Sequence, residues 1–106
     1  MIPKVIERFR ALSDESRIRL LIRLQDGPAN VSTLQGELGI AQASVSKHLA
    51  ILKQVGLVAV NRVGTQSVYE IADQSVFEMC RIVCDGVARQ LREDQAVLQS
   101  MVQQES

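Results

Sequence analysis

The stretch VSTLQGELGIAQASVSKHLAILKQVGLV at Val31–Val58 decides the fold. Apolar residues recur at helical spacing on both sides of Gly39, which predicts a short helix over 32–38 and a longer one over 42–55. The segment Ser32–Gln35 resembles a capping box, so we expect the short helix to begin there. A short helix, a tight turn with glycine and a longer second helix make a helix-turn-helix arrangement.

The flanking sequence predicts two helices before this stretch, and a hairpin and a long helix after it. Apolar residues have helical spacing over 3–12 and 13–25, and their spacing changes to two over 57–62 and 67–71. Helical spacing then returns over 74–99. The predicted order α-α-α-α-β-β-α is a mainly α fold with a small β-hairpin, a winged helix-turn-helix.

Length and composition limit the class of protein. The chain has 106 residues, which suits one domain, and its 12 basic and 12 acidic side chains give a net charge of zero. Charge is uneven, however: the segment 41–69 contains Lys47, Lys53 and Arg62 and no acid. No apolar run is long enough to span a membrane. Two cysteines and no secretory signal favour the reducing cytoplasm.

The second helix of the arrangement has two different faces. On a helical wheel Val45, Leu49 and Leu52 fall together and are expected in the core. The opposite face is small and polar with one cation, Lys47. Small side chains let a helix lie deep in the DNA major groove, and Gln42 at its start can pair with an adenine edge. We therefore expect this helix to bind double-stranded DNA, with the hairpin as a wing beside it.

Several motifs resemble one family. The segments ALSDESRIRLLIRL (Ala11–Leu24), the stretch at Val31–Val58, and RVGTQSVYEI (Arg62–Ile71) are similar to the ArsR/SmtB winged-helix repressors. The resemblance covers roughly residues 9–72 and includes the family's S-x-S-x-H-L recognition helix. It implies a homodimeric repressor that leaves a palindromic operator when an effector binds. Ala41 departs from the pattern, because the family often has a capping serine there.

Residues and boundaries follow from both arguments. The chain is expected to form a single domain, with dimerisation helices at 1–30 and 74–101, the helix-turn-helix at 31–56 and the wing at 57–72. The residues expected to contact DNA lie on the recognition helix and the wing: Gln42, Ala43, Ser44, Ser46, Lys47, His48, Arg62, Thr65 and Gln66. The resemblance places the dimer interface on the first and last helices.

The last helix carries a heptad stripe. Its residues alternate spacings of three and four, with Asp94 as the one polar member: Phe77, Cys80, Cys84, Val87, Leu91, Asp94, Leu98 and Met101. Such a stripe must be buried, and a second subunit is its natural cover. The residues predicted to form the dimer interface are Phe77, Cys84, Val87, Leu91 and Leu98.

The effector is less well defined by the sequence. The family's arsenic-type site needs thiols in the stretch that is Asn30–Leu34 here, and its zinc-type site needs histidines on the last helix; this chain has neither. Cys80 and Cys84, one helical turn apart, remain as a candidate sensor. They fit a thiophilic metal or metalloid ion, a redox or persulfide sensor, or ordinary apolar packing, and these alternatives stay open. Glu78 and Asp85 beside them are expected to raise the thiol pKa.

Other functions are less well supported. A winged helix that binds a protein would show exposed aromatic or leucine side chains on the recognition helix, where this chain has serine, alanine, glutamine and lysine. One histidine, two stripe cysteines and no glycine-rich phosphate loop leave no nucleophile–base pair. We therefore expect that the protein is not an enzyme.

Overall fold

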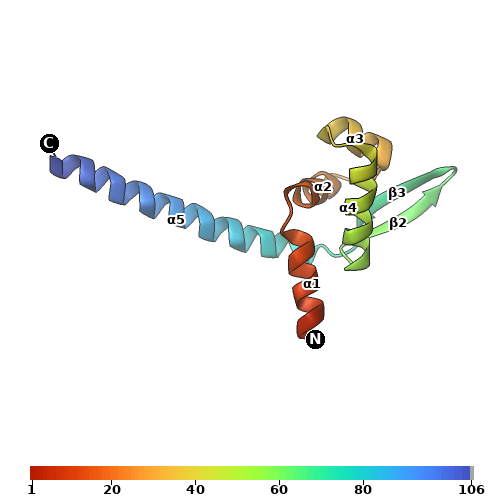
Figure 1. The fold of residues 1–106 in the computed structure, drawn as a ribbon, viewed down its shortest axis with the longest axis horizontal. Helices are drawn as coiled ribbons and strands as arrows, with labels where there is room; N and C mark the ends of the chain where they lie inside the picture. Colours follow the sequence, from red (N-terminus) through yellow and green to blue (C-terminus); the bar gives the residue numbers. More distant parts are fainter. Residues whose placement is uncertain (106) are drawn as a thin grey trace. The chain divides into compact units, whose positions relative to one another are not determined.

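The computed structural model describes residues 1–105 and divides into two units, Met1–Asp73 and the part from Gln74 onward. The two units are described separately. The first unit contains seven elements: α1 (Ile2–Leu12), α2 (Glu15–Gln25), β1 (Ala29–Asn30), α3 (Val31–Leu38), α4 (Gln42–Gln54), β2 (Val58–Val63) and β3 (Gln66–Ile71). Figure 1 labels its four helices and the strands β2 and β3. The second unit is one helix, α5 (Ser75–Glu105).

The sheet has one strand more than the sequence predicts. Its order is β1-β3-β2 and all neighbours are antiparallel. Strands β2 and β3 form the expected hairpin, closed by the pair Val63–Gln66 across a two-residue turn in which Gly64 has a φ of 64°. Strand β1 pairs Ala29 with Tyr69. Two residues carry no period, which is why the sequence pattern misses this strand. The predicted fold class is confirmed.

The core of the first unit consists of aliphatic side chains. The most deeply buried lie on α2, α3, α4 and the start of the hairpin: Leu20, Leu21, Leu34, Val45, Leu49, Leu52 and Leu57. The three residues predicted for the inner face of α4 are all fully buried. Burying one such side chain contributes about 1.5–3 kcal/mol, so the inner face fixes α4 and leaves its other face free.

Polar groups set the helix ends. The predicted capping box at Ser32 is wrong: α3 begins at Val31, and the Asn30 side chain accepts a hydrogen bond from the Thr33 N–H at 2.8 Å. Asparagine is as good a cap as serine, and Asn30 caps the helix two residues before Ser32. Gly39 ends α3 with a φ of 67°, and Ala41 gives α4 no side-chain cap.

Asp14 caps α2, and its ionisation is expected to make stability depend on pH. Its carboxylate accepts the Arg17 backbone N–H at 3.1 Å, and this bond is the main reason that the pKa of Asp14 lies below 3.8. Because the folded-state pKa is lowered, the stabilisation is present above the unfolded pKa and is lost as pH falls through the folded pKa. The Asp14→Ser variant keeps a cap without this carboxylate.

The test compares urea unfolding of wild type and Asp14→Ser at about pH 6 and about pH 3. We expect wild type to be the more stable at the higher pH and the difference to shrink at the lower one. A difference that stays constant between the two pH values would contradict a role for the charge.

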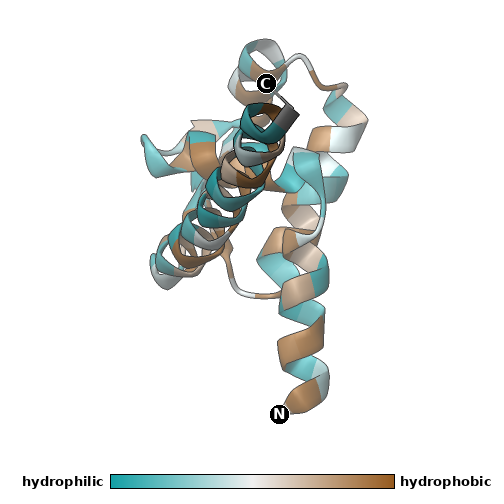
Figure 2. Ribbon diagram, turned by 90° about the vertical axis from the view of Figure 1, so that its left-hand side faces the viewer, coloured by the Kyte–Doolittle hydropathy of each residue, from teal (hydrophilic) through white to brown (hydrophobic). Residues whose placement is uncertain are grey.

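Val76 at the start of α5 is buried, whereas most apolar residues after Cys80 are exposed. Along α5 these include Val83, Val87, Leu91, Leu98 and Met101, each more than half exposed. In Figure 2 brown and teal alternate along this helix, because apolar and polar residues follow one another in its sequence. No helix in the described residues is long and apolar enough to cross a membrane.

Candidate nucleic-acid interface and thiol pair

The outer face of α4 is polar and has no internal partners. Gln42, Ala43, Ser46 and Lys47 are exposed, and Ser44 is half-buried at the start of the helix. Within the described residues, none of these side chains makes a hydrogen bond or an ion pair. The donors and acceptors of this face are therefore available to an external partner, and Lys47 has no carboxylate that neutralises it.

The hairpin carries three of the predicted DNA-contacting residues, and they differ in how many hydrogen bonds they already make within the chain. Thr65 is exposed at the turn. The Gln66 side-chain oxygen accepts a hydrogen bond from Asn30 Nδ2 at 2.8 Å, which leaves its NH₂ group as a donor. The Arg62 guanidinium makes one long contact, 3.4 Å to Ser67 Oγ, and is exposed. The Asn30 bond also ties the start of α3 to the hairpin.

His48 is more buried than the exposed predicted residues of α4. Its side chain is only 17% exposed, and its Nδ1 atom lies 3.1 Å from Arg17 Nη1. A guanidinium can only donate, so Nδ1 must accept and the ring proton sits on Nε2. The Asp14 carboxylate, at 3.9 Å from Nδ1, is too far for a hydrogen bond. Of the ring, only the Nε2–H remains for DNA.

The role of Arg17 could not be predicted from the sequence. Its guanidinium donates from Nε to the Ala11 carbonyl at 2.6 Å and from Nη2 to the Arg10 carbonyl at 3.2 Å, in addition to meeting His48. Arg17 therefore satisfies the end of α1 and connects it to the recognition helix. Its position three residues after the cap Asp14 is the one local signal, and that signal does not reveal the distant partners.

The two cysteines form no disulfide with one another and differ in exposure. Cys80 is half-buried and Cys84 is exposed. The pKa of Cys80 is raised, mainly because burial disfavours the thiolate and secondly because Cys84 is close. The direction is the predicted one, but its causes are not Glu78 and Asp85. In the part of the chain that the structure describes, no three histidine, cysteine or acidic side chains group to hold a metal ion.

Sequence comparison finds a helix-turn-helix domain in the first half of the chain. A family model described as a helix-turn-helix domain matches residues 12–61. The HTH-type transcriptional regulator NmtR of Mycobacterium tuberculosis is 36% identical over 59 residues, which are 56% of this chain and 49% of that protein. The chain thus aligns with about half the length of this curated relative.

Solved structures extend the similarity. Rv0081 of M. tuberculosis has a TM-score of 0.73 and 29% identity over 80% of this chain and 86% of its own. Mb0332 of Mycobacterium bovis, a homodimeric winged helix-turn-helix DNA-binding domain and possible ArsR-family regulator, has a TM-score of 0.76 and 27% identity, covering 87% and 85%.

The fold and the comparisons together define a winged helix-turn-helix protein. Within that class the chain is similar to Mb0332, a possible ArsR-family regulator, and to the ArsR family transcriptional regulator RHA00566, which agrees with the resemblance seen in the sequence.

Proposed function

We propose that the chain is a homodimeric transcriptional repressor that binds a palindromic DNA operator through α4 and the hairpin. The observation that carries this proposal is the outer face of α4, whose polar side chains have no partner within the described residues. NmtR is a transcriptional regulator and Mb0332 a DNA-binding domain, which supports the same function here. No catalytic activity is part of the proposal.

The contacting residues divide by chemistry. Gln42 and Ser46 are assigned to base edges and Lys47 to phosphate, while Ala43 keeps the helix surface low enough for close approach. Ser44 is assigned to phosphate near the helix start. Arg62, Thr65 and the Gln66 NH₂ group are assigned to the neighbouring backbone, and His48 to a contact through Nε2–H.

Dimerisation rests on the stripe of α5. Its members Val87, Leu91 and Leu98 are each more than half exposed in one chain, as expected for residues that a partner covers. Phe77 and Cys84 complete the proposed interface. Mb0332 is homodimeric, which supports a homodimer here. A two-fold dimer presents two recognition helices to successive major grooves, about 34 Å apart.

The effector is proposed to act on Cys80 and Cys84. Two thiolates from each subunit could clamp a thiophilic metal or metalloid ion; oxidation or persulfidation of the exposed Cys84 is the alternative. The raised pKa of Cys80 lowers its thiolate fraction at neutral pH. This favours Cys84 as the first of the pair to react and leaves Cys80 to complete the site.

Fluorescence anisotropy on the DNA upstream of the chain's own gene tests the proposal. The reduced protein is titrated with arsenite, a soft metal ion and a persulfide donor, beside the Cys80→Ser/Cys84→Ser double variant. Specific repression predicts tighter binding to this DNA than to random duplex, and equal affinity for both would contradict it. Release of wild type alone would identify the cysteines as the sensor; release of neither or of both would mean that they only pack.

Two substitutions separate phosphate contacts from base contacts. Lys47→Ala is expected to weaken binding to every sequence and to reduce the salt slope by about one unit, because one phosphate contact is lost. Gln42→Ala is expected to relax discrimination at one base pair, by about 1–3 kcal/mol. Anisotropy over a salt series and a set of operator variants measures both. Equal loss on all operator variants would exclude base recognition by Gln42.

A further inference from the structure

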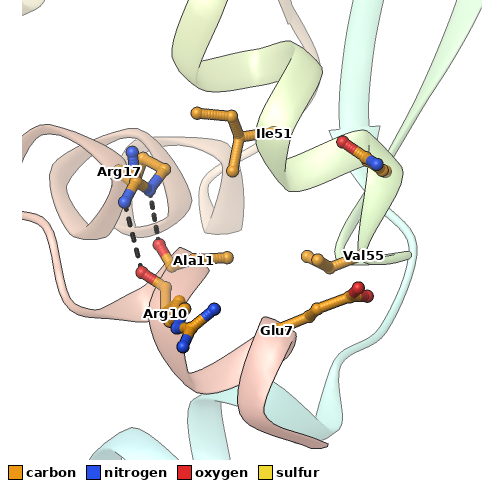
Figure 3. A pocket seen from close by; sticks show the side chains of 7 residues that line it. Glu7, Arg10, Ala11, Arg17, Ile51 and Val55 are labelled. Atoms are coloured by element: carbon orange, nitrogen blue, oxygen red, sulfur yellow. Dashed lines mark hydrogen bonds between the residues drawn. The ribbon is translucent and has the colours of Figure 1, made fainter. Parts of the chain in front are cut away.

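A pocket of about 230 Å³ lies between α1, α2 and α4, and none of the residues proposed to contact DNA lines it. Seven residues line it: Glu7, Arg10, Ala11, Arg17, Ile51, Gln54 and Val55. In Figure 3 Ile51 on α4 and Val55 directly after it point into the space, with Glu7 and Arg10 on the opposite wall. The pocket thus combines an apolar wall with charged groups at its edge.

Two of the lining charges are opposite in sign and unsatisfied. Within the described residues, neither the Glu7 carboxylate nor the Arg10 guanidinium makes a side-chain hydrogen bond or an ion pair, although they lie one helical turn apart. Arg17, by contrast, is held by the carbonyls at the end of α1 and by His48. The pocket therefore has one free anion, one free cation and a fixed back wall.

The size of the pocket limits its ligand. An apolar cavity of about 150 Å³ holds benzene, so a space of about 230 Å³ holds a molecule of about nine non-hydrogen atoms. Ala11, Ile51 and Val55 offer that molecule an aliphatic surface. A ligand that satisfies all of these features carries an ammonium, a carboxylate and a short branched hydrocarbon chain.

The pocket does not coincide with the exposed apolar side of α1. With about 100° between successive residues, Glu7, Arg10 and Ala11 fall on one face, and Val5 and Phe9 fall roughly opposite. Val5 and Phe9 are 42% and 54% exposed. A partner that covers this apolar side leaves the pocket wall of α1 uncovered.

We propose that this pocket binds a branched-chain aliphatic α-amino acid such as leucine. The Arg10 guanidinium takes the carboxylate, the Glu7 carboxylate takes the ammonium, and the side chain packs against Ala11, Ile51 and Val55. Both charged groups are exposed, so each ion pair is weak, and we expect a Kd on the order of 0.1–1 mM. The site does not depend on DNA binding.

The test is a ¹⁵N-edited NMR titration of the full chain without DNA. L-leucine is expected to shift the amide signals of Ala11, Ile51 and Val55 saturably. Two analogues are expected to bind several-fold more weakly than leucine. Isocaproate lacks the ammonium and leaves the Glu7 carboxylate unpaired, and isoamylamine lacks the carboxylate and leaves the Arg10 guanidinium unpaired. No saturable shift by about 10 mM leucine, or shifts confined to other residues, would overturn the proposal.

Charge variants give the sharper result. Glu7→Gln and Arg10→Gln are each expected to weaken leucine binding about three- to fivefold. Glu7→Gln should at the same time strengthen isocaproate binding, and Arg10→Gln should strengthen isoamylamine binding. Lys4→Gln, on the same helix but outside the pocket, is the matched control and should change none of them. All three positions are exposed, and the NMR spectrum itself verifies folding. The same ligand ranking in all variants would overturn the assigned roles.

Discussion

We expect the replacement of Arg17 by alanine to lower the free energy of unfolding by about 2–3 kcal/mol. This is the usual loss when hydrogen bonds of a charged group are only partly replaced by bonds to water. The guanidinium donates to the Ala11 and Arg10 carbonyls and meets His48 Nδ1. Without it, the Ala11 carbonyl loses the Arg17 donor, the Arg10 carbonyl keeps only its donors from Ser13, and His48 loses the group that holds its ring. For a domain of this size the loss corresponds to roughly 10–20 °C in Tm.

Arg19→Ala is the control for this prediction. Arg19 is on the same helix two residues later, and its one ion pair, with Glu15 at 2.7 Å, is largely exposed. Such a pair contributes about 0.3–0.5 kcal/mol. Urea unfolding of both variants at equal protein concentration gives the comparison, since dimer stability depends on concentration. Similar losses in the two variants would show that Arg17 acts only as another surface charge.

The Arg17 variant is also expected to bind DNA more weakly at temperatures where it is fully folded. His48 and the inner face of α4 share the task of orienting the recognition helix, and only the second remains in Arg17→Ala. Arg17→Lys keeps the charge but not the planar fork of donors, so it is expected to resemble alanine more than arginine in both measurements.

The parts of the fold with strong periodicity could be predicted from the sequence. Val45, Leu49 and Leu52 repeat at helical spacing and are fully buried, because one face of a helix must cover the core. The hairpin follows from alternation around Gly64, which the φ of 64° confirms as a turn residue. These elements are set by local pattern and by burial acting in the same direction.

Features without local pattern could not be predicted. Strand β1 has two residues, and it exists because Ala29 pairs with Tyr69, forty positions away. Arg17 and His48 are thirty-one residues apart and meet only after α2 and α4 pack. In the same way, the sequence placed His48 among the DNA-contacting residues through a motif, whereas its ring orientation depends on a partner that no motif includes.

For the same reason, some parts of the candidate site could be predicted from the sequence and others could not. The exposed polar face of α4 follows directly from the buried face, because residues opposite a core stripe face outward. The pocket beside α1 has no such signature, since its wall is assembled from Arg10, Ile51 and other residues of three helices. The cysteine pair lies between these cases: its spacing is visible in the sequence, and its exposure depends on what covers α5.

Introducing a charge at Leu91 is expected to separate the proposed dimer. Leu91 is 62% exposed in one chain and lies at the middle of the α5 stripe. In a two-fold dimer Leu91→Asp places two carboxylates in a surface that excludes water, and neither has a cation to pair with. The association constant is expected to fall by a factor on the order of 1,000, which corresponds to about 4 kcal/mol.

Analytical ultracentrifugation over a concentration series measures the effect, and anisotropy on the operator follows its consequence. A monomer offers one recognition helix, so we expect operator affinity to fall with dimerisation while binding to random duplex changes little. Gln99→Asp is the matched control, because Gln99 is exposed on α5 but follows the stripe residue Leu98 on the polar side. It should remain dimeric. A Leu91→Asp protein that sediments as a dimer would place the interface elsewhere, and the exposed face of α1 at Val5 and Phe9 would then be the next to test.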